Sequence, residues 1–106
     1  MSILYIGNDM LLELAGSGML VDQQGNPVTG ATVEATIFEA DGVTEVEGIT
    51  WPLTLVEGAI AGEYSVIIQS EVEIEADKKY IIKITAAKGD VNSTWIMQTK
   101  AKNRLV

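Results

Sequence analysis

The residues of this 106-residue chain whose types and spacing could do chemistry are mainly carboxylates. Glu71, Glu73 and Glu75 alternate along one segment, and paired carboxylates are the groups that hydrolyse glycosidic bonds. Side chains at every second position of a strand share one face, so the three would lie side by side. The simpler interpretation is a solvated strand face whose charge discourages pairing between sheet edges, and we favour it.

Nucleophilic chemistry lacks its usual partners, because the chain has no histidine and no cysteine. Histidine is the commonest general base for an activated serine. A Gly-Ser-Gly stretch at 16–18 is followed by strand-like residues, whereas a phosphate-binding loop would lead into a helix. We therefore predict no enzymatic activity. The serines that stand without a triad signature are Ser2, Ser17, Ser65, Ser70 and Ser93.

Metal binding is the remaining chemical alternative. Asp22, Glu39 and Asp41 lie in or beside expected turns, where carboxylates and backbone carbonyls hold Ca²⁺ in many proteins. Their spacing matches no recognised calcium loop, and we favour capping of the turns as their role. We predict no cofactor, with calcium as the alternative.

Charge is divided along the sequence. The formal net charge is -8, yet residues 1–76 contain 13 acidic groups and no lysine or arginine, and residues 77–106 contain all 7 basic groups. Phosphate binding needs clustered Lys and Arg, so nucleic acid is not an expected partner. No apolar run approaches the roughly 18 residues of a membrane span. The first residues do not resemble a secretory signal, so we expect the chain to stay where it is made.

The elements that must position these residues are strands, because apolar residues alternate with polar ones in most segments. Turn signals separate the segments, and no stretch has a sustained helical period. We predict an all-β chain: one immunoglobulin-like β-sandwich domain of about seven strands over 1–106, with extended segments at 1–8 and 101–106. Pro52 cannot donate to a ladder and predicts an edge or bulge. The expected strands lie in DMLLELAG, GMLVD, ATVEATIFEA, ITWPLTLVE, GEYSVIIQS, VEIEAD, YIIKITAAK and STWIMQTKA. The expected core is Val33, Ile37, Tyr64, Val66, Ile68, Tyr80, Ile82, Ile84 and Trp95.

The stretch VDQQGNPVTGATVEA resembles the first hairpin of several bacterial immunoglobulin-like and prealbumin-like modules. In those modules an Asp-x-x-Gly-x-Pro-Val turn leads into a Gly-Ala-x-Val strand. The physical reasons are local: Asp22 caps the turn with its carboxylate, Gly25 takes a positive φ, and Pro27 ends the preceding pairing.

A second resemblance lies in IEADKKYIIKI, which is similar to the corner before the sixth strand of such sandwiches. There a tyrosine hydroxyl bonds the upstream backbone, and Ile74 and Tyr80 match the motif. Asp77 stands where related domains often carry glycine. Residues 9–100 together are similar to small immunoglobulin-like proteins encoded among the virion assembly genes of tailed bacteriophages and prophages. This resemblance implies a structural protein of the neck or tail, located in the virion or in the host cytoplasm during assembly.

The resemblance also implies the partners: other virion or surface proteins, and further copies of this chain in a homo-oligomer. The apolar first segment, MSILYIGND, and the basic and apolar last segment, TKAKNRLV, are the expected contacts. Each could add a strand to a neighbouring subunit or lie across its acidic surface, and disorder of both ends is the alternative. The alternative function is a carbohydrate- or cell-surface-binding module, in which Trp51, Tyr64 and Trp95 would form a stacking platform; burial of these rings in the core is the competing interpretation. The candidate interaction residues are Lys100, Lys102, Arg104, Leu105 and Trp51.

Overall fold

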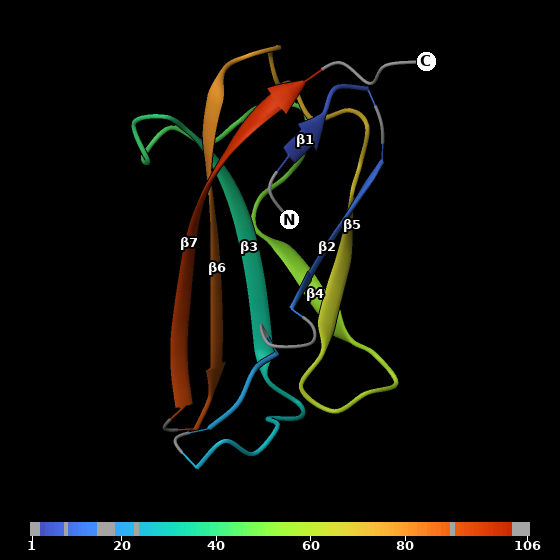
Figure 1. The fold of residues 1–106 in the computed structure, drawn as a ribbon, viewed down its shortest axis with the longest axis vertical. Coiled ribbons are helices and arrows are strands. Elements are labelled where there is room, and N and C mark those ends of the chain that lie inside the picture. Colours follow the sequence, from blue (N-terminus) through green and yellow to red (C-terminus); the bar gives the residue numbers. More distant parts are fainter. Residues whose placement is uncertain (1–2, 8, 15–18, 23, 90, 103–106) are drawn as a thin grey trace.

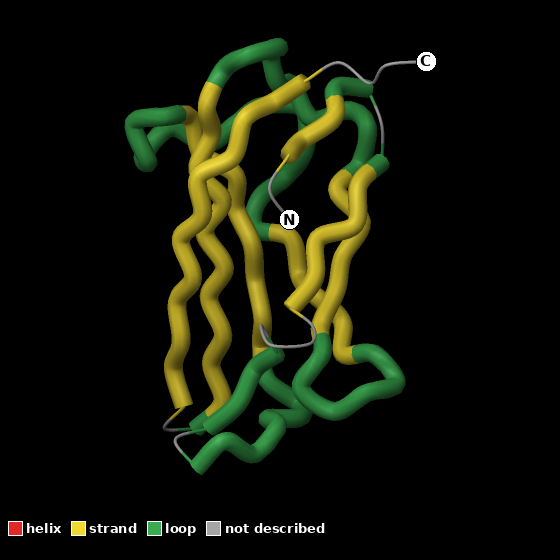
Figure 2. The backbone as a smooth tube through the Cα atoms, in the orientation of Figure 1, coloured by secondary structure: helices red, strands yellow, loops and turns green. Residues whose placement is uncertain are grey.

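A computed structural model of the chain describes residues 3–7, 9–14, 19–22, 24–89 and 91–102. These residues confirm the predicted all-β class, because they form strands and connecting loops and no helix (Figure 2). The described residues accordingly include no helix of the length and apolar character needed to cross a membrane.

The strands differ greatly in length. The two longest strands, β6 and β7, follow each other directly and pair along their length as a hairpin. In chain order the strands are β1 (Ile3–Tyr5), β2 (Met10–Leu14), β3 (Thr32–Glu39), β4 (Leu53–Glu57), β5 (Tyr64–Ile68), β6 (Lys79–Lys88) and β7 (Val91–Lys102).

The strands join into one curled sheet with the order β1-β7-β6-β3-β4-β5-β2 (Figure 1). β1 pairs with β7 in parallel, and every other pair is antiparallel. β4 connects the two halves, since Leu53–Leu55 pair with β3 while Val56 and Glu57 pair with β5. One half therefore contains β1, β7, β6 and β3, and the other contains β5 and β2.

The apolar core follows from the period of the strands. Ile82 and Ile84 of β6 and Ile37 of β3 face Leu12 of β2 and Ile68 of β5 in one apolar cluster. Full burial of such a side chain stabilises the fold by roughly 1.5–3 kcal/mol. All the predicted core residues belong to this cluster or pack against it; Val66 and Trp95 are the ones only partly buried.

A buried tyrosine fixes the corner before β6, as the sequence predicts. The hydroxyl of Tyr80 accepts a hydrogen bond of 2.7 Å from the backbone N–H of Glu75. The chain reverses through Asp77, whose φ of 64° lies in the left-handed region that glycine adopts most easily. The Asp77 N–H donates to the carbonyl of Ala101 at 2.7 Å, so the corner is also tied to β7.

The turn in the VDQQGNPV stretch has the predicted capping. The Asp22 carboxylate accepts hydrogen bonds of 2.9 Å from the N–H groups of Gln24 and Asn26, and Gly25 has a φ of 84°. A second tyrosine anchors the residues that follow: the Tyr64 hydroxyl donates to the Val28 carbonyl at 2.8 Å and accepts from the Ala31 N–H at 3.1 Å. These hydrogen bonds give residues 22–31 a structural role.

Three expected strands differ from the structure. The VEIEAD segment alternates in burial as predicted, but it is a loop: its described backbone bonds include one from the Glu73 N–H to the Glu47 carbonyl of another loop, at 2.8 Å. Expected strand 49–57 begins only at Leu53, because Pro52 has no N–H to donate to the ladder. In GMLVD, Val21 forms an isolated bridge with Pro27.

Replacing Tyr80 by phenylalanine tests the corner. Tyr80→Phe keeps the ring in the core but leaves the Glu75 N–H without its acceptor, so we expect a loss of about 1–3 kcal/mol in the free energy of unfolding. Urea unfolding followed by circular dichroism measures it. The control Thr54→Val removes an exposed hydroxyl and should change stability by less than about 0.5 kcal/mol. Equal stability of Tyr80→Phe and the unmodified chain would contradict the anchoring role.

Candidate interaction surfaces

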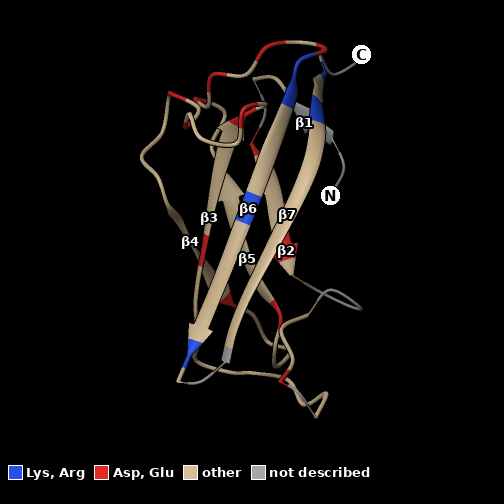
Figure 3. Ribbon diagram, turned by 90° about the vertical axis from the view of Figure 1, so that its left-hand side faces the viewer, with Lys and Arg blue, Asp and Glu red and all other residues tan. Residues whose placement is uncertain are grey.

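Acidic side chains gather at one end of the molecule, on the loop between β3 and β4 and the loop between β5 and β6. The hydrogen bond from the Glu73 N–H to the Glu47 carbonyl holds the two loops together. We call this surface the acidic end (Figure 3). Its members are Asp41, Glu45, Glu47, Glu71, Glu73 and Glu75, all exposed.

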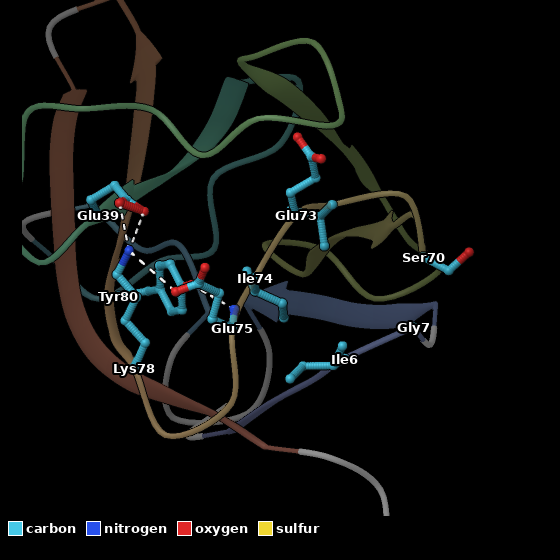
Figure 4. A pocket seen from close by; sticks show the side chains of 10 residues that line it. Ile6, Gly7, Glu39, Ser70, Glu73, Ile74, Glu75, Lys78 and Tyr80 are labelled. Carbon is cyan, nitrogen blue, oxygen red and sulfur yellow. Dashed lines mark hydrogen bonds and ion pairs between the residues drawn. The ribbon is translucent and has the colours of Figure 1, made fainter.

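A single lysine lies among these carboxylates. Lys78 Nζ contacts both carboxylate oxygens of Glu39, at 2.9 and 3.0 Å, and lies 3.9 Å from Glu75 (Figure 4). Its Nζ also lies 5.8 Å from the centre of the Tyr80 ring. The hydrogen bond to Glu39 raises the pKa of Lys78 above its ordinary value, so the ammonium group stays charged. Glu39 and Lys78 therefore neutralise each other and leave the charge of the acidic end in place.

The acidic end is hollowed. Two adjoining depressions of about 430 and 320 Å³ share Glu39, Glu73, Glu75 and Lys78 in their walls. The larger also has apolar walls, including Ile6 and Ile74, as Figure 4 shows. Volumes of this order accommodate a side chain or a small ligand.

The predicted turn carboxylates bind groups of the protein itself, through hydrogen bonds or an ion pair. The Asp41 carboxylate accepts from the N–H groups of Val43 and Thr44 at 2.8 and 2.9 Å and from the Thr44 hydroxyl at 2.6 Å. These bonds, with the Thr44 hydroxyl first, lower the pKa of Asp41 to about 2. Asp22 caps its own turn and Glu39 holds Lys78. Over the described ranges, no three metal-ligating side chains are grouped to hold a metal ion.

Lysines gather on the outer side of β6 and β7, opposite the core. Lys79 and Lys100 are directly paired across the two strands, and Lys83 is paired with Ile96, whose side chain is 67% exposed. In β3, β6 and β7, Glu34 is the one described acidic residue on this side. We call this surface the basic face (Figure 3). Its lysines are Lys79, Lys83, Lys100 and Lys102, and none has an ion pair with a described carboxylate.

Of the candidate interaction residues, Lys100 and Lys102 belong to the basic face. Arg104 and Leu105 lie outside the described residues. Trp51 is elsewhere: its ring is partly buried against the core, and its indole N–H donates to the Val46 carbonyl. Lys79 and Lys83 of the basic face are not among the interaction residues predicted from the sequence. The period of two in β6 places them opposite Tyr80, Ile82 and Ile84, and could have identified them.

A third surface is apolar. Leu11 of β2 and Ile67 of β5 are directly paired on the outer side of their half-sheet, and Val56 of β4 is exposed nearby. β2 is also a sheet edge, bonded to β5 alone among the described strands. Exposed side chains of this kind on a sheet edge favour contact with another protein.

The carboxylate of Asp41 should make stability depend on acid. Its pKa is lower in the folded chain than the ordinary 3.8, so its bonds stabilise the fold fully above about pH 4, and this contribution is lost as the pH falls toward 2. Asp41→Asn should lower the thermal midpoint at pH 7, and the gap to the unmodified chain should close on acidification. The neighbouring exposed carboxylate gives the control Glu45→Gln, which should lack this gap at pH 7. A pH-independent gap for Asp41→Asn would contradict the assignment.

The chain was compared with protein families, curated proteins and solved structures. No protein-family model, curated protein or solved structure matches the chain. The surfaces and the sequence resemblance are therefore the basis for a functional interpretation.

Proposed function

We propose that this chain is a non-enzymatic structural protein of a tailed-phage or prophage particle, in its neck or tail region, and that it acts through protein–protein contacts. The observation that carries this proposal is the separation of unpaired charge into a basic face and an acidic end on one small β scaffold. A surface arranged in this way steers and orients another protein during association.

The fold within this proposal is an immunoglobulin-like sandwich. Two half-sheets that enclose one core, a connecting strand shared between them and the Tyr80 corner support it. The phage assignment rests on the resemblance of the VDQQGNPVTGATVEA and IEADKKYIIKI segments to virion proteins of this kind. It implies the virion, or the bacterial cytoplasm during assembly, as the location.

Affinity in such contacts would come from apolar burial. Exposed ion pairs contribute only about 0–1 kcal/mol each, so charge selects the orientation of the partner. Ile96 on the basic face, together with Leu11, Ile67 and Val56 on the opposite half-sheet, supplies exposed apolar area. Both kinds of surface are therefore present on the same molecule.

The alternative is a carbohydrate- or cell-surface-binding module, which needs exposed aromatic rings. Tyr64 is 2% exposed, and Trp51 and Trp95 pack partly buried against the core. These rings come from different strands and loops and do not support a flat stacking platform, so we retain the structural role.

Particle composition tests the proposed function. Particles induced from a bacterium that carries this gene should contain the chain after gradient purification, at a fixed ratio to the major structural proteins. Deletion of the gene should stop assembly at an incomplete particle seen by electron microscopy, and expression in trans should restore it. Complete, infectious particles that lack the chain would contradict the proposal.

A further inference from the structure

We propose that the basic face of one copy docks on the acidic end of a second copy of this chain. The contact rests on the proposed function, since it names one partner through which the structural role would be carried out. It is a contact between unlike surfaces, and the charged side chains of both are exposed on the separate molecule.

The basic face is built at an energetic cost within one molecule. Lys79 and Lys100 are directly opposite each other on antiparallel strands, and like charges in that position are destabilising. Neither has an ion pair with a described carboxylate, and the same holds for Lys83 and Lys102. An anionic partner placed over this face would convert repulsion into attraction.

The acidic end has the opposite arrangement. Glu45, Glu47, Glu71 and Glu73 are exposed and have no ion pair with a described lysine. The one lysine among them, Lys78, is held by Glu39. Four unpaired glutamates at this end thus face outward, and four unpaired lysines lie on the face of the sheet. This charge complementarity identifies the second copy as the partner.

The acidic end has room for a lysine side chain beside Lys78. Its depressions, of about 430 and 320 Å³, have carboxylates in their walls, and apolar side chains such as Val46 and Ile74 also line them. A lysine can lay its aliphatic stem against apolar atoms while its ammonium group reaches a carboxylate. On the basic face, Lys83 has exposed Ile96 beside it, so apolar burial would accompany the ionic contact.

The contact joins two unlike surfaces, so it is heterologous, or head to tail. The basic face runs along the outer side of β6 and β7. The acidic end consists of the two loops at the end of the molecule where β6 begins (Figure 3). Docking of one surface on the other leaves a free basic face and a free acidic end on the pair. Contacts of this kind repeat, and they close into rings when the rotation between copies allows.

A nucleic acid is a weaker explanation of the basic face. The chain has a formal net charge of -8, and the lysines of β6 and β7 begin next to the acidic end. A phosphate backbone long enough to span these lysines would be repelled by the neighbouring carboxylates. A folded partner that presents a compact acidic surface avoids this repulsion.

Paired charge reversals test the contact. In the first variant, Lys83→Glu and Lys100→Glu reverse the basic face. In the second, Glu47→Lys and Glu73→Lys reverse the acidic end, and the bond between their loops is kept because it joins backbone atoms. The matched single controls are Lys88→Glu at the far end of β6 and Glu13→Lys on β2, both at exposed positions. Thermal unfolding verifies each fold, and Lys83→Gln with Glu73→Gln replace any reversal that fails to fold.

Mass is measured by light scattering across protein and salt concentrations. The unmodified chain should associate, and high salt should weaken the association because it screens exposed charge. Each paired reversal alone should need at least about tenfold more protein to associate, because like charges then meet. An equimolar mixture of the two reversals should associate again, since each supplies the surface that the other repels. The single controls should behave like the unmodified chain.

Three results would overturn the contact: an unmodified chain that stays monomeric at every soluble concentration, reversals that leave association unchanged, or folded reversals whose mixture stays monomeric. Each leaves the proposed function to be judged on its own, because the presence of the chain in particles does not depend on self-association through these surfaces. Absence from particles, with an intact contact in solution, would instead contradict the structural role alone.

Discussion

The pairing register of β6 is the constraint on which the rest of the structure depends. β6 pairs with β3 through eight residues and with β7 through ten, so both neighbours hold it in one position. In this register Tyr80, Ile82, Ile84 and Ala86 enter the core, and Lys79 and Lys83 point outward. Because strand side chains alternate, a slip of one residue would send the lysines into the core and the isoleucines into water. The register of β6 therefore determines both the burial of its apolar side chains and the exposure of its lysines.

The same register brings the opposite charges to their places. β6 begins directly after the Tyr80 corner, so the carboxylates of the preceding loop stay at the end of the molecule while the lysines follow the sheet. The Lys78–Glu39 pair joins the start of β6 to the end of β3 and removes one charge of each sign from the surface. The lysines of the basic face and the glutamates of the acidic end belong to separate surfaces, and the proposed contact between copies would join them.

Much of this arrangement could be predicted from the sequence. Alternation predicts the strands with β-branched residues and the core, and turn chemistry predicts the roles of Asp22 and Gly25, because these features depend on neighbours along the chain. The Tyr80 corner is implied by the resemblance of the IEADKKYIIKI segment. The VEIEAD loop was mistaken for a strand, since alternating burial over the end of the core has the same pattern as a ladder. The acidic end could not be predicted: it needs Glu47 and Glu73, from different loops, to meet through a backbone bond. The outward direction of Lys79 and Lys83 can be predicted from the period of β6. That no carboxylate of β3 or β7 lies directly opposite them follows only from the pairing of these strands.

Zero-length cross-linking in a mixture of isotopically light and heavy chains tests the central claim most directly. A carbodiimide joins a lysine to a carboxylate only when the two are in contact, and a light–heavy cross-linked peptide must come from two copies. The head-to-tail contact predicts light–heavy links from Lys79, Lys83 or Lys100 to Glu45, Glu47, Glu71 or Glu73, and these links should fade at high salt. Links confined to single copies, such as Lys78 to Glu39, or links between copies that avoid the acidic end, would contradict the account.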